Sequence, residues 1–167
     1  GQLLAEVVIL MLYARRPEVV EVAERAHALA AQSGDPAACA RADAVLGLAY
    51  ALCGRAHEAG TYLARSTELI RVGGAPQQAV HLLQHVVIGL SAIERYTESM
   101  ALCRQYVAAV RGVGAAGVLP MMLCLLSNTA YFTSEFDVME MAATEALGLA
   151  ASTGAIASFQ IGAAMRP

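Results

Sequence analysis

The sequence predicts an all-α fold, a solenoid of antiparallel helix pairs with a repeat of about 40 residues. Three observations support this prediction. Glycines recur at that interval, nearly charge-free segments alternate with charge-rich ones, and no segment shows the sustained two-residue alternation of a strand. The recurring glycines are Gly34, Gly74, Gly114 and Gly154.

Other residues keep the same register. Pro36 and Pro76 follow two of the glycines, and an acidic residue recurs at Glu18, Glu58 and Glu98. Proline suits the first turn of a helix, where its missing N–H would be unpaired anyway. A basic position recurs as Arg15, Arg55 and Arg95, with Glu135 in the fourth copy.

Each unit is expected to hold two helices. Pro36 marks a helix start and Gly54 its end, because glycine tolerates the left-handed conformation of a helix C-terminus. We expect one helical-repeat domain over 1–167, a fragment of a larger protein, with units of about 1–34, 35–74, 75–114 and 115–154 and a partial fifth over 155–167. The expected helices span 2–14 and 17–33, 36–53 and 56–72, 76–93 and 96–112, 118–133 and 136–152, with 156–166 beginning the fifth unit.

The two helices of a unit differ in charge. First helices are almost charge-free, with Glu6, Arg41 and Asp43 as exceptions, whereas second helices carry most of the charged residues. This is the pattern of an outer, amphipathic layer over a buried one. A single hairpin cannot bury its apolar face, so stability is expected to come from stacking of neighbouring units.

Composition excludes several classes of protein. Hydrophobic residues make up 57% and charged residues 15% of the chain, and the net charge is −3. Direct binding of nucleic acid is not expected, because such surfaces are basic. No secretory signal begins the sequence, so we expect a cytoplasmic protein. The four scattered cysteines are interpreted as small core residues: Cys39, Cys53, Cys103 and Cys124.

An uncharged run over 112–134 is long enough to span a bilayer. It contains glycines, a proline and polar residues such as Ser127, Asn128 and Thr129, which are costly within a membrane span. It also falls where the repeat places a turn and a buried helix. We therefore expect a buried helix and no membrane partner.

The second unit carries a recognisable motif. Leu46-Gly47, Tyr50, Gly54, Glu58-Ala59 and Leu63 resemble the tetratricopeptide (TPR) signature. In that arrangement the small Gly47 and Ala59 let two helices approach, while Tyr50 and Leu63 fill the space between them. The resemblance implies a right-handed TPR-like solenoid, although a TPR unit has about 34 residues. A period of about 40 residues also suits HEAT-type repeats, which stay an alternative.

Longer TPR-like repeats of this kind resemble the helical regions of large LuxR-type bacterial transcriptional regulators, which also carry a nucleotide-binding switch and a helix-turn-helix domain. The resemblance implies a non-catalytic region that binds an effector, a protein or a peptide. The alternatives are a stand-alone adaptor that binds a partner peptide and a dimerisation scaffold.

Residues that could carry chemistry have plainer interpretations. The G-x-G-x-x-G pattern over 112–117 follows a helix instead of a strand, so no dinucleotide cofactor is expected. His81 and His85 have a spacing that suits a metal, but no further ligand completes a site. His27, His57 and the carboxylates of the second helices are interpreted as solvated. No set of titratable groups converges, so neither catalysis nor a cofactor is expected.

The concave face is the predicted binding surface. In TPR arrays the first helix of each unit lines the groove. The resemblance therefore implies that equivalent positions on the first helices of the second, third and fourth units face a ligand. The resulting surface would be mixed, with one cation, amides, hydroxyls and apolar patches, and would suit a peptide or a small neutral ligand. Its predicted members are Arg41, Ala44 and Leu48, then His81, Gln84, Ile88 and Ser91, then Met121, Cys124, Asn128 and Tyr131.

Overall fold

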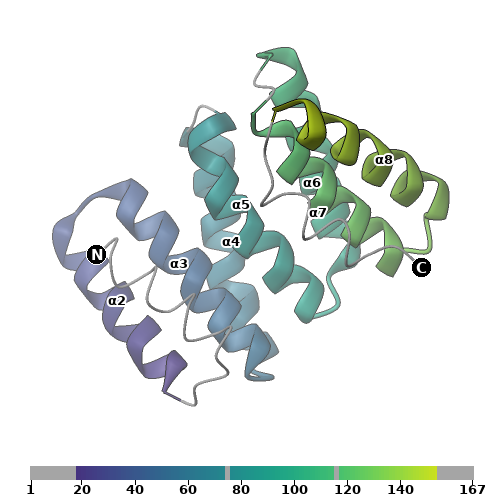
Figure 1. Ribbon diagram of the computed structural model, residues 1–167. Helices are drawn as coiled ribbons and strands as arrows, with labels where there is room; N and C mark the ends of the chain where they lie inside the picture. Colours follow the sequence, from purple (N-terminus) through teal and green to yellow (C-terminus); the bar gives the residue numbers. More distant parts are fainter. Residues whose placement is uncertain (1–17, 74–75, 115–116, 154–167) are drawn as a thin grey trace. The chain divides into compact units, whose positions relative to one another are not determined.

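The computed structural model describes residues 18–73, 76–114 and 117–153 (Figure 1). All regular secondary structure within these ranges is α-helical, which confirms the predicted class there. The expected helices over 2–14 and 156–166 lie outside the described residues. The described helices are α2 (Val19–Ser33), α3 (Pro36–Leu52), α4 (Ala56–Gly73), α5 (Pro76–Ala92), α6 (Tyr96–Gly112), α7 (Leu119–Phe132) and α8 (Phe136–Thr153).

The turns inside the helix pairs recur at one fixed interval. Gly54, Glu94 and Ser134 each adopt a left-handed backbone, with φ of 77°, 62° and 60°. The next helices accordingly begin at 56, 96 and 136. In the first and third of these turns, a backbone N–H reaches back to a carbonyl of the preceding helix, which is the Schellman arrangement of a helix C-terminus. These bonds run from Arg55 to Tyr50 and from Glu135 to Ala130, both at 2.9 Å.

The chain divides into two compact units, each larger than one of the expected 40-residue repeats. From here on, the first unit and the second unit are these two compact units. Among the described residues, the first unit holds 18–73 and 81–94, and the second holds 76–80, 95–114 and 117–153. In the first unit α3 packs against α2 and α4. In the second unit α7 packs against α6 and α8. Each unit therefore has a charge-poor helix, α3 or α7, between two more polar ones.

Leu63 is the centre of packing in the first unit. It lies on α4 and is fully buried against two glycines, Gly47 on α3 and Gly89 on α5. A Cβ added at Gly47 would come within 2.8 Å of the Leu63 Cγ, and one added at Gly89 within 2.8 Å of the Leu63 Cδ2. The glycines thus make the room that Leu63 occupies. The expected role of Gly47 is confirmed, and Gly89 adds a second close approach.

The second unit uses small hydroxyl side chains at its close approaches. Ser127, which lies 80 residues after Gly47, donates a hydrogen bond to the carbonyl of Met139 on α8 at 3.0 Å. Ser99 on α6 and Thr129 on α7 are buried, and their hydroxyl oxygens lie 3.3 Å apart. Thr129 also bonds the Leu125 carbonyl at 2.9 Å. Buried hydroxyls need such partners, because an unpaired one would be costly.

The uncharged run over 112–134 forms a turn and then α7, as expected. Most of α7 is buried, from Pro120 to Ala130. Among the described helices none has the length and hydropathy needed to cross a membrane.

We predict that Gly47→Ala lowers the free energy of unfolding by about 1–3 kcal/mol, because the new Cβ would also lie 3.1 Å from the Leu63 backbone nitrogen. The matched control is Gly148→Ala in α8, where an added Cβ meets nothing within 4 Å. That change should stabilise by about 0.5–1 kcal/mol, because alanine is the better helix former. Urea denaturation of both variants measures the difference. Equal effects at the two positions would contradict the close approach.

We also predict that Ser134→Gly raises the free energy of unfolding by about 1 kcal/mol, because a left-handed backbone is unfavourable for a residue with a Cβ. The reverse change, Gly54→Ser at the equivalent turn, should lower it by a similar amount. An added Cβ at Gly54 meets nothing within 4 Å, so the cost there is one of backbone conformation. Denaturation midpoints test both, and a loss of stability in Ser134→Gly would rule this out.

Candidate functional site

The most unusual side chain of the first unit is a fully buried carboxylate. Asp43 on α3 has 0% exposure and lies between a residue of α2 and a residue of α4. The His27 Nε2 atom lies 3.0 Å from one Asp43 oxygen, and the Arg65 Nε atom lies 3.4 Å from the other. One side chain therefore connects three helices.

Burial dominates the electrostatics of Asp43. It raises the pKa of the carboxyl above its ordinary value, against the opposing charges of Arg65 and then His27. The His27 and Arg65 nitrogens lie within ion-pair distance of the carboxylate, but neither contact has the geometry of a well-directed hydrogen bond. A buried carboxylate in this condition costs stability in its ionised form.

Aromatic rings line the same region. The rings of His27 and Tyr62 pack edge to face, with their centroids 5.2 Å apart. Tyr62 also lies 5.7 Å from the ring of Tyr50, and the guanidinium of Arg65 lies 5.8 Å from the Tyr62 ring centre. Aromatic rings attract cations over their faces, which helps to hold Arg65 near Asp43.

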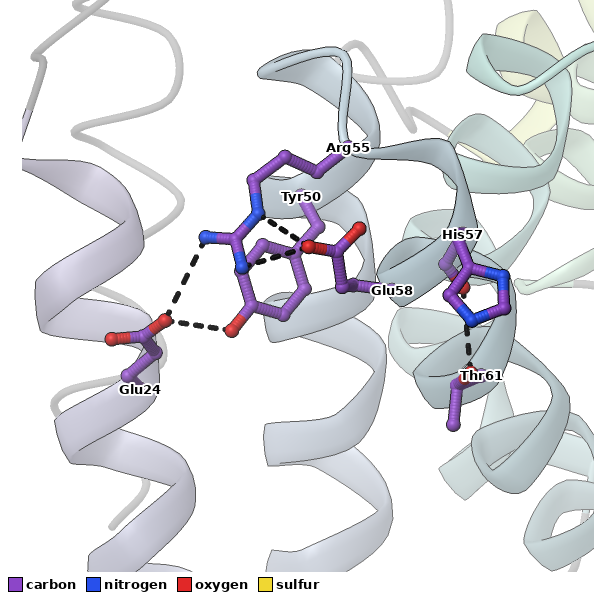
Figure 2. A network of polar contacts seen from close by, with 6 residues as sticks. All are labelled: Glu24, Tyr50, Arg55, His57, Glu58 and Thr61. Atoms are coloured by element: carbon purple, nitrogen blue, oxygen red, sulfur yellow. Dashed lines mark hydrogen bonds and ion pairs between the residues drawn. The ribbon is translucent and has the colours of Figure 1, made fainter.

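A second network lies at the turn between α3 and α4 (Figure 2). The Tyr50 hydroxyl donates a hydrogen bond of 2.7 Å to Glu24, and burial together with this bond raises the pKa of Tyr50 to about 12. The guanidinium carbon of Arg55 lies 4.2 Å above the Tyr50 ring. Arg55 also donates to Glu58 at 2.9 Å and lies 3.9 Å from Glu24. The chain thus holds one arginine between an aromatic face and two carboxylates.

His57 and Thr61 on α4 lie beside this network (Figure 2). Thr61 donates to the carbonyl of His57 at 3.4 Å. The His57 side chain is exposed, in agreement with the prediction that it is solvated.

These networks correct one expectation. His27 is not simply solvated, because its side chain is three-quarters buried and pairs with Asp43. The sequence also did not predict that two pairs of titratable groups meet between α2 and α3, His27 with Asp43 and Glu24 with Tyr50. The available signal was Asp43 itself, a charged residue in a helix with almost no others. Its partners were hidden because they belong to other helices.

The predicted groove residues of the first unit divide by exposure. Arg41, Gln84, Ile88 and Ser91 are half-buried and keep some accessible surface. Leu48, at 5% exposure, packs into the core with its backbone against Gly89. It therefore offers little area to a ligand, because helix packing needs the same face. Ala44 is also buried, and the side chain of His81 lies outside those described.

The predicted groove residues of the second unit lie on α7. Met121 and Asn128 are half-buried, whereas Cys124 is buried in the core. Tyr131 is 56% exposed at the end of the helix.

Tyr131 belongs to a cluster of three aromatic rings that was not predicted from the sequence. Its ring meets that of Phe132 edge-on at 5.5 Å, and Phe132 stacks on Tyr96 at 5.3 Å with 9° between the planes. Phe132 is still 47% exposed. The signal was the run of aromatics near residue 131 in a chain with only 5% aromatic residues. We call Tyr96, Tyr131 and Phe132 the aromatic cluster.

The remaining chemical motifs have structural roles where they are described. Gly114 ends α6 in a left-handed turn with φ of 66°, so a helix precedes the glycine-rich pattern. Burial raises the pKa of the Cys103 thiol to about 12, which keeps it protonated. Cys124 is buried as expected and Cys39 half-buried, but Cys53 is exposed, contrary to expectation.

Metal ligands do not gather in the described part of the chain. No group of three His, Cys, Asp or Glu side chains there has the arrangement to hold a metal ion. His85 on α5 is half-buried.

No protein-family model matches the chain, and no curated protein matches it significantly.

We predict that the stability of the wild type relative to Asp43→Asn increases as pH falls. The folded-state pKa of Asp43 lies above 3.8, so in the window between that pKa and 3.8 the folded chain binds a proton that the unfolded chain lacks. The wild type therefore gains stability as pH falls through this window and loses it as pH rises. Urea denaturation from pH 7 to 4 measures the difference.

The exposed Asp137→Asn variant is the control for removing one carboxylate. If instead the wild type lost stability relative to Asp43→Asn on acidification, the ion pairs would outweigh burial. The assignment of desolvation as the dominant effect would then be wrong.

Proposed function

We propose that this chain is a non-catalytic, TPR-like binding module with a right-handed stack of 40-residue helix pairs. The turns at Gly54, Glu94 and Ser134 support the proposal, since the same left-handed geometry recurs at one interval. The burial of Leu63 against Gly47 also supports it, because these residues occupy TPR motif positions. A stack of this kind presents a repeated surface and contributes binding without chemistry.

The observation that carries the binding role is the aromatic cluster. Tyr131 and Phe132 remain about half exposed although their rings already contact one another. Exposed aromatic side chains that are held in place by neighbours are typical of interfaces, because they add contact area at little cost in conformational entropy. We therefore place the partner-binding surface of the second unit at this cluster, next to Asn128 of the predicted groove.

We further propose that the module belongs to a cytoplasmic transcriptional regulator of the LuxR-type group. In that role it would bind a protein, a peptide or a small effector and transmit the event to other domains. The Ala-, Gly- and Arg-rich repeat supports this assignment by resemblance. A stand-alone adaptor that binds a partner peptide remains the alternative, and exposure of Tyr131 and Phe132 is consistent with it too.

The binding role predicts that a photo-crosslinking residue at position 131 captures a specific partner in cells. The matched control places the same residue at Ala28, which is exposed on α2. We expect an adduct with another protein when the crosslinking residue is at position 131 and none when it is at position 28. The affinity of the captured partner for the chain should fall about tenfold in Phe132→Ala, as expected for an aromatic anchor. No adduct would contradict the binding role, and an adduct with a second copy would favour a dimerisation scaffold.

The regulator assignment makes a separate prediction. The gene that encodes this chain should also encode a nucleotide-binding segment and a helix-turn-helix segment. Sequencing the gene on both sides tests this, and finding neither segment would leave the adaptor role.

A further inference from the structure

The outer face of α8 combines exposed apolar side chains with carboxylates. Phe136 is 56% exposed and Met141 is 67% exposed, and both are large apolar residues. With 3.6 residues per turn, Phe136, Asp137, Glu140, Met141 and Thr144 share one side of the helix. The last four, with Glu145, line a shallow surface hollow of about 520 Å³. We call Phe136, Asp137, Glu140, Met141 and Thr144 the α8 face.

Within the described residues, the Asp137 and Glu140 carboxylates of this face have no cationic partner. The sequence of α8 contains three acidic residues and no basic one. Glu145 pairs with Arg111 of α6, and Glu135 before the helix pairs with Arg104. Within the described residues no ion pair involves Asp137 or Glu140. Two carboxylates therefore lie beside exposed apolar groups, and the described part of the chain supplies no cation to them.

Elsewhere in the chain, an aromatic ring beside a carboxylate contacts an arginine. At the equivalent turn of the first unit, Arg55 lies over the Tyr50 ring and pairs with Glu58 (Figure 2). Arg95, the next member of the same series, pairs with Glu98. The fourth position in this series is Glu135, so α8 begins with an aromatic ring and carboxylates but no arginine.

We propose that the α8 face docks an arginine-bearing segment of a partner protein. This inference rests on the proposed binding role and names the chemistry of the partner. A guanidinium can stack on Phe136 while its N–H groups pair with Asp137 or Glu140. The apolar stem of the arginine would cover Met141. An acidic segment or a nucleic acid would be repelled by the same carboxylates.

The test is a display selection of random 12-residue peptides on the immobilised 167-residue chain. Arginine should be enriched over lysine among the selected peptides, because only arginine offers a planar group that stacks and forms paired bonds. Binding of these peptides should fall about tenfold in Asp137→Asn/Glu140→Gln and several-fold in Phe136→Ala. These substitutions are on an exposed surface, and circular dichroism checks that the helices are retained.

The matched control is Glu18→Gln/Glu21→Gln, which removes two exposed carboxylates from the other unit and changes the net charge equally. It should leave binding unchanged. Equal losses in both double variants, or selected peptides without enriched arginine, would overturn the inference. Peptides that lose affinity only in Phe132→Ala would overturn it while leaving the proposed binding role intact. A selection that yields no binding peptide would count against both.

Discussion

The close approach of α3, α4 and α5 around Leu63 is the constraint on which the first unit depends. Two glycines on neighbouring helices leave the volume that one leucine fills. Close packing of this kind fixes how far apart the helix axes lie, because neither glycine can be enlarged without moving a helix. The burial of Tyr50 and of Asp43 follows, since both lie on α3, whose face is held against α4.

The second unit also brings its helices close together, but with small hydroxyl side chains instead of glycines. Ser127 takes the place of Gly47 in the register, and its hydroxyl bonds a carbonyl of the facing helix. A small hydroxyl side chain keeps the helices close but adds a directional contact that glycine lacks. The two units thus share a backbone plan while differing in what holds their helices together and in what they leave exposed. The first unit buries Tyr50 beneath Arg55, whereas the second leaves Tyr131 and Phe132 at the surface.

Much of the fold could be predicted from the sequence because its signals are local. Glycines and prolines at a fixed interval placed the ends of α3 to α8 within a few residues. The charged cluster could not be predicted, because pairing of His27 with Asp43 depends on which faces of two helices meet. Leu48 illustrates the same limit for the groove. A motif register assigned it to a binding face, but its side chain is only 5% exposed.

The position of Asp43 also bears on how such a chain can evolve. Units of a helical repeat can be duplicated or exchanged when each brings its own contacts, but this carboxylate draws one partner from α2 and another from α4. Exchange of the segment from α3 to α4 alone would separate it from His27 and leave a buried charge with less compensation. Recombination breakpoints between α2 and α3 should therefore be disfavoured, and these three helices should be inherited as one block.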